Sequence, residues 1–143
     1  MLNTSWLFWA LLSAVFAAMT AVLTKLGVNT INSDFATFIR TCVILLLVGG
    51  IAYFTKQFQP ISSLSGRGLT FLVLSGLATG ASWLCYFRAM QLGQAAQVAP
   101  IDKLSVVLVA VFSVALLGEQ LSGINWLGIA LITAGVILVA WQG

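Results

Sequence analysis

The chain has 143 residues, of which 61% are hydrophobic and 6% are charged, and its formal net charge is +3. A soluble domain carries about 25% charged residues, and a short chain cannot hide so much apolar surface from water. Lipid must therefore surround most of these side chains. The six Lys and Arg residues are scattered, which excludes nucleic acid as a partner because its binding requires a basic patch.

Five apolar segments are long enough to cross a bilayer, which takes about 20 residues each. In chain order they are predicted at residues 5–25, 34–55, 68–90, 97–117 and 123–142. The connections between them are short and polar, so none of them can form a soluble domain. We therefore predict an all-α integral membrane protein in which residues 1–143 form a single transmembrane domain.

The first segment is expected to stay in the mature protein. Residues 1–24 contain no Lys or Arg, whereas a cleavable signal peptide begins with a positively charged region. Trp6 and Trp9 lie near its start and Trp141 lies at the end of the last segment. Tryptophan is enriched at both membrane–water interfaces, so we interpret these three as interfacial anchors.

The second segment contains a cation at depth. Asp34 is the predicted N-cap of this helix. The charge-free part, residues 41–55, would be about 22 Å long, which is shorter than a hydrocarbon core of about 30 Å. Arg40 therefore lies at or inside the membrane boundary. Two interpretations are open: its long stem snorkels to the headgroups, or it faces a wet cavity and binds an anionic or polar group of a substrate.

The third segment brings together polar and aromatic side chains. We take Ser82, Trp83, Tyr86 and Arg88 as candidate substrate-binding residues, because aromatic surface beside polar groups suits amphipathic ligands. Packing against lipid or another helix is the alternative for each aromatic residue. Cysteines lie inside the second and third segments, and we expect both to be free and to serve in packing; they are Cys42 and Cys85.

The fourth segment has two adjacent charges. Lys103 lies as deep as Arg40 by the same argument, and Asp102 follows Pro100 at the start of the predicted helix. The short side chain of Asp102 cannot snorkel far. A helix N-terminus would stabilise its carboxylate, a proton-carrying role is a second option, and an ion pair with Lys103 or Arg88 is a third. We favour the ion pair, and we include Asp102 and Lys103 among the candidate substrate-binding residues.

In the fifth segment, Gly128 and Gly135 are seven residues apart and share one face. Glycine permits close approach of another helix. That helix belongs either to the same chain or to a second copy, and the second option makes both glycines candidate dimer contacts.

The basic residues give little information on orientation. Four of them, Lys25, Arg40, Arg88 and Lys103, lie toward one side of the membrane, and two lie toward the other. An excess of Lys and Arg marks cytoplasmic loops, but Arg40 and Lys103 lie within helices, so the loops are nearly unbiased. Either the N-terminus is outside, or the chain inserts both ways and pairs with an inverted copy of itself, as in transporters built from inverted repeats.

An ordered set of motifs spans almost the whole chain. It comprises YFRAMQLG from residue 86, VAPIDKLS from residue 98, LGE from residue 117 and NWLGIALITAGVILV from residue 125, together with KLG at residue 25 and IRT at residue 39. In this set the chain resembles the EamA-type unit of the drug/metabolite transporter superfamily. Most members have two such five-helix units in inverted orientation, whereas this chain is similar to the single-unit bacterial and archaeal branch.

The resemblance implies a secondary transporter of small metabolites or drugs in the bacterial or archaeal cytoplasmic (inner) membrane. It would work by alternating access as a homodimer of ten helices, parallel or antiparallel, with a cavity lined by the first four helices of each unit. The resemblance supplies no catalytic residues, and the chain contains no histidine, the commonest metal ligand. We expect no enzymatic activity, no metal and no cofactor. The alternative is a non-transporting subunit that scaffolds partner membrane proteins, which would have no need of the charged residues at depth.

Overall fold

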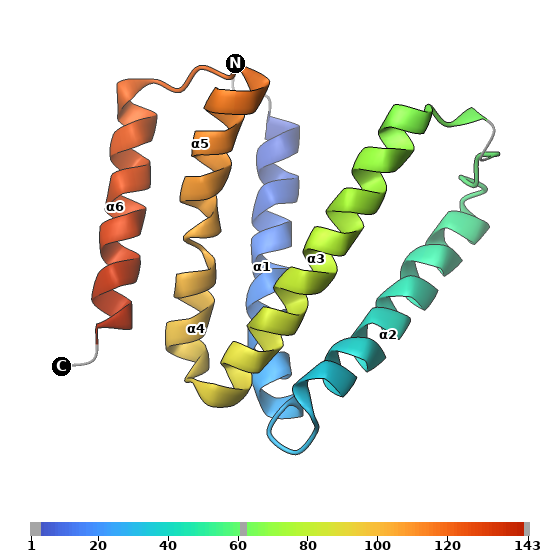
Figure 1. The fold of residues 1–143 in the computed structure, drawn as a ribbon, viewed down its shortest axis with the longest axis horizontal. Coiled ribbons are helices and arrows are strands. Elements are labelled where there is room, and N and C mark those ends of the chain that lie inside the picture. Colours follow the sequence, from blue (N-terminus) through green and yellow to red (C-terminus); the bar gives the residue numbers. More distant parts are fainter. Residues whose placement is uncertain (1–3, 61–62, 142–143) are drawn as a thin grey trace. The chain divides into compact units, whose positions relative to one another are not determined.

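The computed structural model describes residues 4–60 and 63–141, and over these residues it contains helices and no strands (Figure 1). The helices are α1 (Thr4–Gly27), α2 (Ser33–Phe54), α3 (Gly66–Leu92), α4 (Ala95–Asp102), α5 (Ser105–Leu117) and α6 (Gly123–Ala140). Because α4 and α5 together form one span, the chain has five segments long and apolar enough to cross a membrane. This confirms the predicted all-α membrane fold. The predicted end of the last segment, residue 142, lies outside the described residues.

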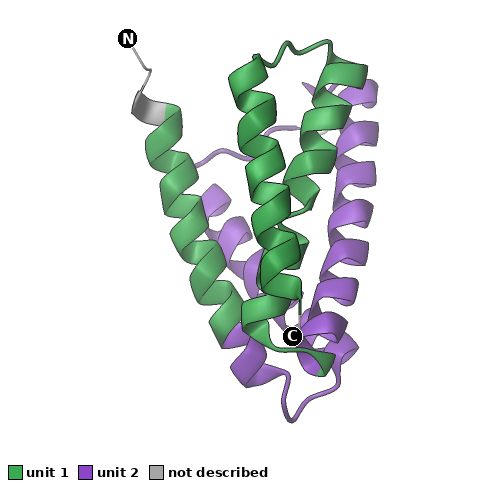
Figure 2. Cartoon of the chain, turned by 90° about the vertical axis from the view of Figure 1, so that its left-hand side faces the viewer, with its two compact units in different colours: residues 1–22, 92–143 green, residues 23–91 purple. Residues whose placement is uncertain are grey.

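The chain divides into two compact units (Figure 2). Unit 1 comprises residues 1–22 and 92–143, and therefore holds most of α1 together with α4, α5 and α6. Unit 2 comprises residues 23–91 and holds the last turn of α1 with α2 and α3. Within unit 1, α6 packs against both α4 and α5.

In unit 2, α2 begins at an asparagine cap. The Asn32 side chain accepts hydrogen bonds from the backbone N–H groups of Asp34 at 2.9 Å and Phe35 at 3.3 Å. These N–H groups have no partner inside the helix, so the cap satisfies two of them. The prediction that Asp34 is the N-cap is therefore wrong. Asp34 lies in the first turn instead, where the helix dipole still stabilises its carboxylate.

In unit 1, α5 and α6 are separated by explicit stop and start signals. α5 ends at Gly118, whose φ of 70° is left-handed; glycine adopts this conformation without the steric cost that a Cβ imposes. α6 starts after Ser122, whose hydroxyl accepts a hydrogen bond from the backbone N–H of Asn125 at 3.3 Å. The connection is therefore a defined turn.

The fourth span is interrupted, although the sequence predicted one continuous helix over residues 97–117. The backbone N–H groups of Lys103 and Leu104 donate to the carbonyls of Pro100 and Ile101 at 2.9 and 3.0 Å. These are i→i−3 bonds, which tighten the last turn of a helix. Pro100 has no N–H and cannot bond the Ala96 carbonyl, so the α-helical ladder is already weakened here.

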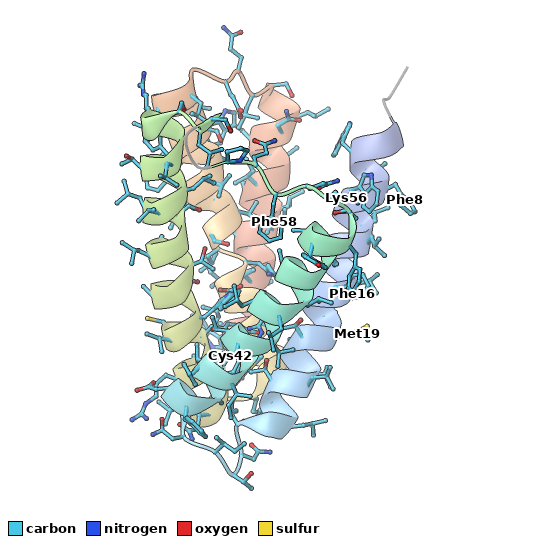
Figure 3. The ribbon with its side chains drawn as sticks, turned by 90° about the vertical axis from the view of Figure 1, so that its right-hand side faces the viewer. Phe8, Phe16, Met19, Cys42, Lys56 and Phe58 are labelled. Carbon is cyan, nitrogen blue, oxygen red and sulfur yellow. The ribbon has the colours of Figure 1, made fainter. Side chains whose placement is uncertain are left out.

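Most large apolar side chains on all five spans are exposed. Leu46 on α2 is 76% exposed and Leu138 on α6 is 74% exposed. Phe8, Phe16 and Met19 stand clear of the α1 backbone and are each more than half exposed (Figure 3). In water this surface would aggregate, so it is suited to contact with lipid or another protein.

Candidate functional site

The candidate site in unit 2 is centred on Arg40 of α2. Its guanidinium carbon lies 4.6 Å from the centroid of the Trp83 ring and 5.4 Å from that of the Phe87 ring. Both rings belong to α3 and are four residues apart, so they lie on one face of that helix. A guanidinium within about 6 Å of a ring centroid is attracted by the ring quadrupole, by up to about 2 kcal/mol where water is excluded. We name Arg40, Trp83 and Phe87 the Arg40 cluster.

The Arg40 cluster lies within the spans and not at their ends. Arg40 comes seven residues after Ser33, the first residue of α2, which places its backbone about 10 Å along the helix. Trp83 precedes the end of α3 by nine residues, or about 13 Å. The structure thus places the cation inside its helix, as the sequence indicated, and adds two aromatic partners.

The other predicted residues of α3 differ in their surroundings. Tyr86 is partly buried, and its ring centroid is 6.5 Å from that of Phe87 in an edge-on arrangement. Trp83, Tyr86 and Phe87 share one helix face because they stand at i, i+3 and i+4. Ser82 and Arg88 are exposed. Phe87 was not among the predicted residues, although its spacing from Trp83 could have indicated it.

Polar contacts fix the end of α3 beside the α1–α2 connection. Lys25 Nζ donates a hydrogen bond of 2.8 Å to the Met90 carbonyl. The Gln91 amide donates to the carbonyls of Val28 at 3.4 Å and Ile31 at 3.3 Å. Carbonyls at the end of a helix lack internal partners, and a cation there is favoured by the helix dipole. These contacts, which the sequence did not reveal, hold α3 in register with the start of α2.

The same end of unit 2 contains its most buried side chains. Phe87 and Met90 are almost fully buried, as are Ser33 and Thr37 on α2. The Thr37 hydroxyl donates to the Ser33 carbonyl at 2.8 Å, so its polar group is satisfied inside the helix. Phe87, which contacts Arg40, therefore belongs to the packed part of the unit.

In unit 1, the two charges of the fourth span pair with each other. Asp102 Oδ2 lies 3.3 Å from Lys103 Nζ, and the side chains are 36% and 56% exposed respectively. The sequence placed Asp102 at a helix start, which is wrong: it is the last residue of α4. The interruption between α4 and α5 begins directly after it. A pairing of Asp102 with Arg88 of the other unit stays a prediction.

The predicted site residues therefore fall into two groups. Arg40, Trp83 and Tyr86 lie together in unit 2, and Asp102 and Lys103 lie together in unit 1. A cavity shared by both groups stays a prediction. Both cysteines are free, Cys42 partly buried and Cys85 exposed, and their role in packing stays a prediction. The described part of the chain contains no group of three or more His, Cys, Asp or Glu residues that could hold a metal ion.

The glycines of α6 have open space around them. A Cβ built at Gly128 or at Gly135 would meet no atom within 4 Å. The packing of α6 against α4 and α5 in unit 1 therefore does not depend on either glycine. Their role as dimer contacts stays a prediction.

Comparison with known proteins identifies the family. The model of the EamA-like transporter family matches residues 4–141, almost the whole chain. The chain belongs to the EamA-like transporter family. This EamA-like chain is also 61% identical over 139 residues to a protein of Sinorhizobium sp. described as "Uncharacterized transporter in cobO 3'region", and the match covers 97% of this chain and 99% of that protein. No solved structure gives a significant match.

The family assignment confirms the resemblance drawn from the sequence motifs. With five apolar spans, this EamA-like chain is a multi-pass membrane protein with a transporter role. The Sinorhizobium relative has nearly the same length as this chain.

Proposed function

We propose that this EamA-like protein is a secondary transporter that moves small metabolites or drugs across the cytoplasmic membrane of a bacterium or archaeon by alternating access. The family match and the relative described as a transporter support the general role. The partners in this proposal are the bilayer, a small-molecule substrate and a second copy of the chain.

The observation that carries the proposal furthest is the position of Arg40. A charged residue inside a transmembrane helix costs about 2.5–3.5 kcal/mol at the bilayer centre on insertion scales, so such residues usually face a protein interior or a wet cavity and serve function. Arg40 lies about 10 Å along α2 and contacts aromatic rings. A scaffold held only by apolar packing would have no need of this charge.

The interrupted fourth span supports the same function. Irregular backbone at membrane depth is tolerated where it is buried in protein or lines an aqueous cavity, and transporters often bind substrates at discontinuous helices. The interruption at residues 103–104 carries the Asp102–Lys103 ion pair. It therefore offers polar groups at an irregular turn within one span.

The proposal is tested by flux in reconstituted vesicles. Purified protein would be incorporated into liposomes loaded with a defined mixture of amino acids, sugars, carboxylic acids and lipophilic cations, and the solutes released would be measured by mass spectrometry. We expect at least one solute to leave faster than from empty liposomes. Arg40→Gln should reduce that flux about tenfold or more, whereas Arg67→Gln, which removes an exposed arginine near Phe71 at the start of α3, should not.

A scaffolding subunit would give a different result in the same experiment. If folded protein in the vesicles releases none of these solutes, and the same protein co-purifies with other membrane proteins from native membranes, it acts as a scaffolding subunit. Thermal unfolding of each variant before reconstitution separates loss of flux from loss of fold.

A further inference from the structure

The charge of Arg40 is not neutralised within its own unit. Residues 23–91 contain five Lys or Arg residues and a single acid, Asp34. Asp34 lies in the first turn of α2, about 9 Å along the helix from Arg40, where its carboxylate accepts a hydrogen bond of 3.3 Å from the Ser33 hydroxyl. Among the described residues, Arg40 makes no ion pair or hydrogen bond; it contacts the two aromatic rings and interacts electrostatically with Tyr86.

The other cations of unit 2 stand in different surroundings. Lys25 is bonded to the Met90 carbonyl. Arg67 lies 5.9 Å from the Phe71 ring near the start of α3, and it is exposed, as is Arg88. Arg40 is therefore the cation of this unit that is partly buried within a span and has its hydrogen-bond donors unused by the described residues. No nitrogen of the Arg40 side chain is buried without a partner, so these donors are accessible to a ligand.

The aromatic rings attract the guanidinium of Arg40 through their faces, and this contact does not use its N–H donors. The guanidinium has five N–H donors in a planar fork, and a carboxylate can accept two of them in parallel. Such charge-assisted bonds are strongest where water is scarce, since the local dielectric is low. A single guanidinium neutralises one negative charge. A carboxylate carries one negative charge, so it matches Arg40 better than a multiply charged phosphate does.

The surroundings of Arg40 also select the rest of the ligand. Trp83 and Tyr86 are partly buried, and they present aromatic surface on the same face of α3. Aromatic faces pack well against planar or apolar groups. We propose that the Arg40 cluster, with Tyr86, binds small monocarboxylates that have an aromatic or apolar body. This inference rests on the proposed transport function, and it names the substrate class.

A lipid headgroup could supply similar anionic chemistry. The rings, however, hold the guanidinium against α3 at the level of Trp83, about 13 Å before the end of that helix. A headgroup phosphate lies at the membrane boundary, so this position favours a solute that enters the protein. The experiment separates the two sources directly.

The test measures binding to the purified full-length protein by isothermal titration calorimetry, with benzoate, benzamide and benzylamine as probes. The three probes share a ring and differ in charge. We expect benzoate to bind at least tenfold more tightly than benzamide, and benzylamine to give no measurable binding. Arg40→Gln should weaken benzoate binding at least tenfold, and the matched control Arg67→Gln should leave it unchanged.

Arg40→Lys guards against a variant that fails to fold. It keeps a cation beside the rings but loses the planar fork, so benzoate should bind several-fold more weakly while the melting temperature stays near that of the original protein. Equal binding of benzoate and benzamide would overturn the proposal, because that comparison uses the unaltered protein. Full benzoate affinity in folded Arg40→Gln would overturn it as well.

Two further measurements distinguish a lipid headgroup from a free carboxylate, and binding from transport. The titration is repeated in nanodiscs of phosphatidylcholine with and without phosphatidylglycerol. If Arg40-dependent thermal stabilisation comes from phosphatidylglycerol and not from benzoate, the anion is a lipid headgroup and the proposed substrate class is wrong. Arg40-dependent benzoate binding without flux of any solute would uphold the site and contradict transport, whereas flux of uncharged solutes alone would do the reverse.

Discussion

At the scale of single residues, two cations of unit 2 are accommodated by different chemistry. Lys25 gives its ammonium to a carbonyl at the end of α3, and Arg40 places its guanidinium against two rings of the same helix. A compact ammonium is a strong point donor, whereas a planar, weakly hydrated guanidinium stacks well on aromatic surface. Each residue thus links α3 to a different helix of unit 2.

Replacing Lys25 by Met tests whether its hydrogen bond stabilises the end of α3. Met keeps much of the stem but leaves the Met90 carbonyl without its 2.8 Å hydrogen bond. A hydrogen bond to a charged group contributes about 1.5–3 kcal/mol, so we expect a lower melting temperature in detergent and faster amide exchange at the end of α3. Lys56→Met, which alters an exposed lysine after α2, is the control. A loss no larger than that of the control would show that Lys25 does not stabilise this end of the unit.

At the scale of elements, the fourth span combines a proline, an ion pair and a change of hydrogen-bond pattern. Pro100 removes one bond of the ladder, and i→i−3 bonds follow at residues 103 and 104. Asp102 and Lys103 occupy the same turn and pair with each other at 3.3 Å. Within a bilayer an irregular turn is retained when it has a use, because a continuous helix satisfies the backbone better.

Pro100→Ala should therefore make the helix of the fourth span more regular and lower the rate of transport. Alanine restores the N–H that can donate to the Ala96 carbonyl and has the highest helix propensity. We expect slower hydrogen exchange over residues 100–107, an unchanged or higher melting temperature, and flux reduced severalfold. Val109→Ala on the exposed side of α5 serves as control. Undiminished flux in a protein with slowed exchange would mean that the interruption plays no part in transport.

The elements also show what the sequence could and could not predict. Hydrophobicity alone located the five spans, and the shortness of residues 41–55 predicted that Arg40 lies at or inside the membrane boundary. Phe87 and Gln91 were missed because these helices are apolar on nearly every side, so no polar face marks which residues turn toward a neighbouring helix. Asp102 was placed at the start of a helix, whereas it is the last residue of α4.

At the scale of the whole molecule, the question is how a single five-span unit completes a transport path. Most large apolar side chains of the spans are exposed, and lipid or a second copy must cover them. The glycines of α6 are the best-defined candidates for contact with a second copy. A Cβ at either one meets no atom within 4 Å, so this face could receive another helix closely.

Gly135→Leu tests that contact. The larger side chain should separate two copies joined at this face while leaving the single chain folded, because Gly135 is exposed. We expect the dimer dissociation constant, measured in detergent by light scattering, to rise at least tenfold. Ala130→Leu, an exposed position on another face of α6, should not change it. If Gly135→Leu dimerises like the original protein, the copies meet elsewhere.

The distribution of positive charge predicts how the two copies of the proposed dimer are oriented. Five spans place the N- and C-termini on opposite sides, and the Lys and Arg residues number four on one side and two on the other. All four of the first group lie within the spans, so the loop bias that fixes orientation is weak. We therefore expect the chain to insert in both directions.

C-terminal fusions to alkaline phosphatase and to green fluorescent protein, which report opposite sides, should both be active at comparable expression. Three lysines added after Met1 should then shift the population to a single orientation with a cytoplasmic N-terminus. Activity of one reporter alone in the unmodified chain would rule out an antiparallel dimer, and the proposed transporter would then be a parallel pair.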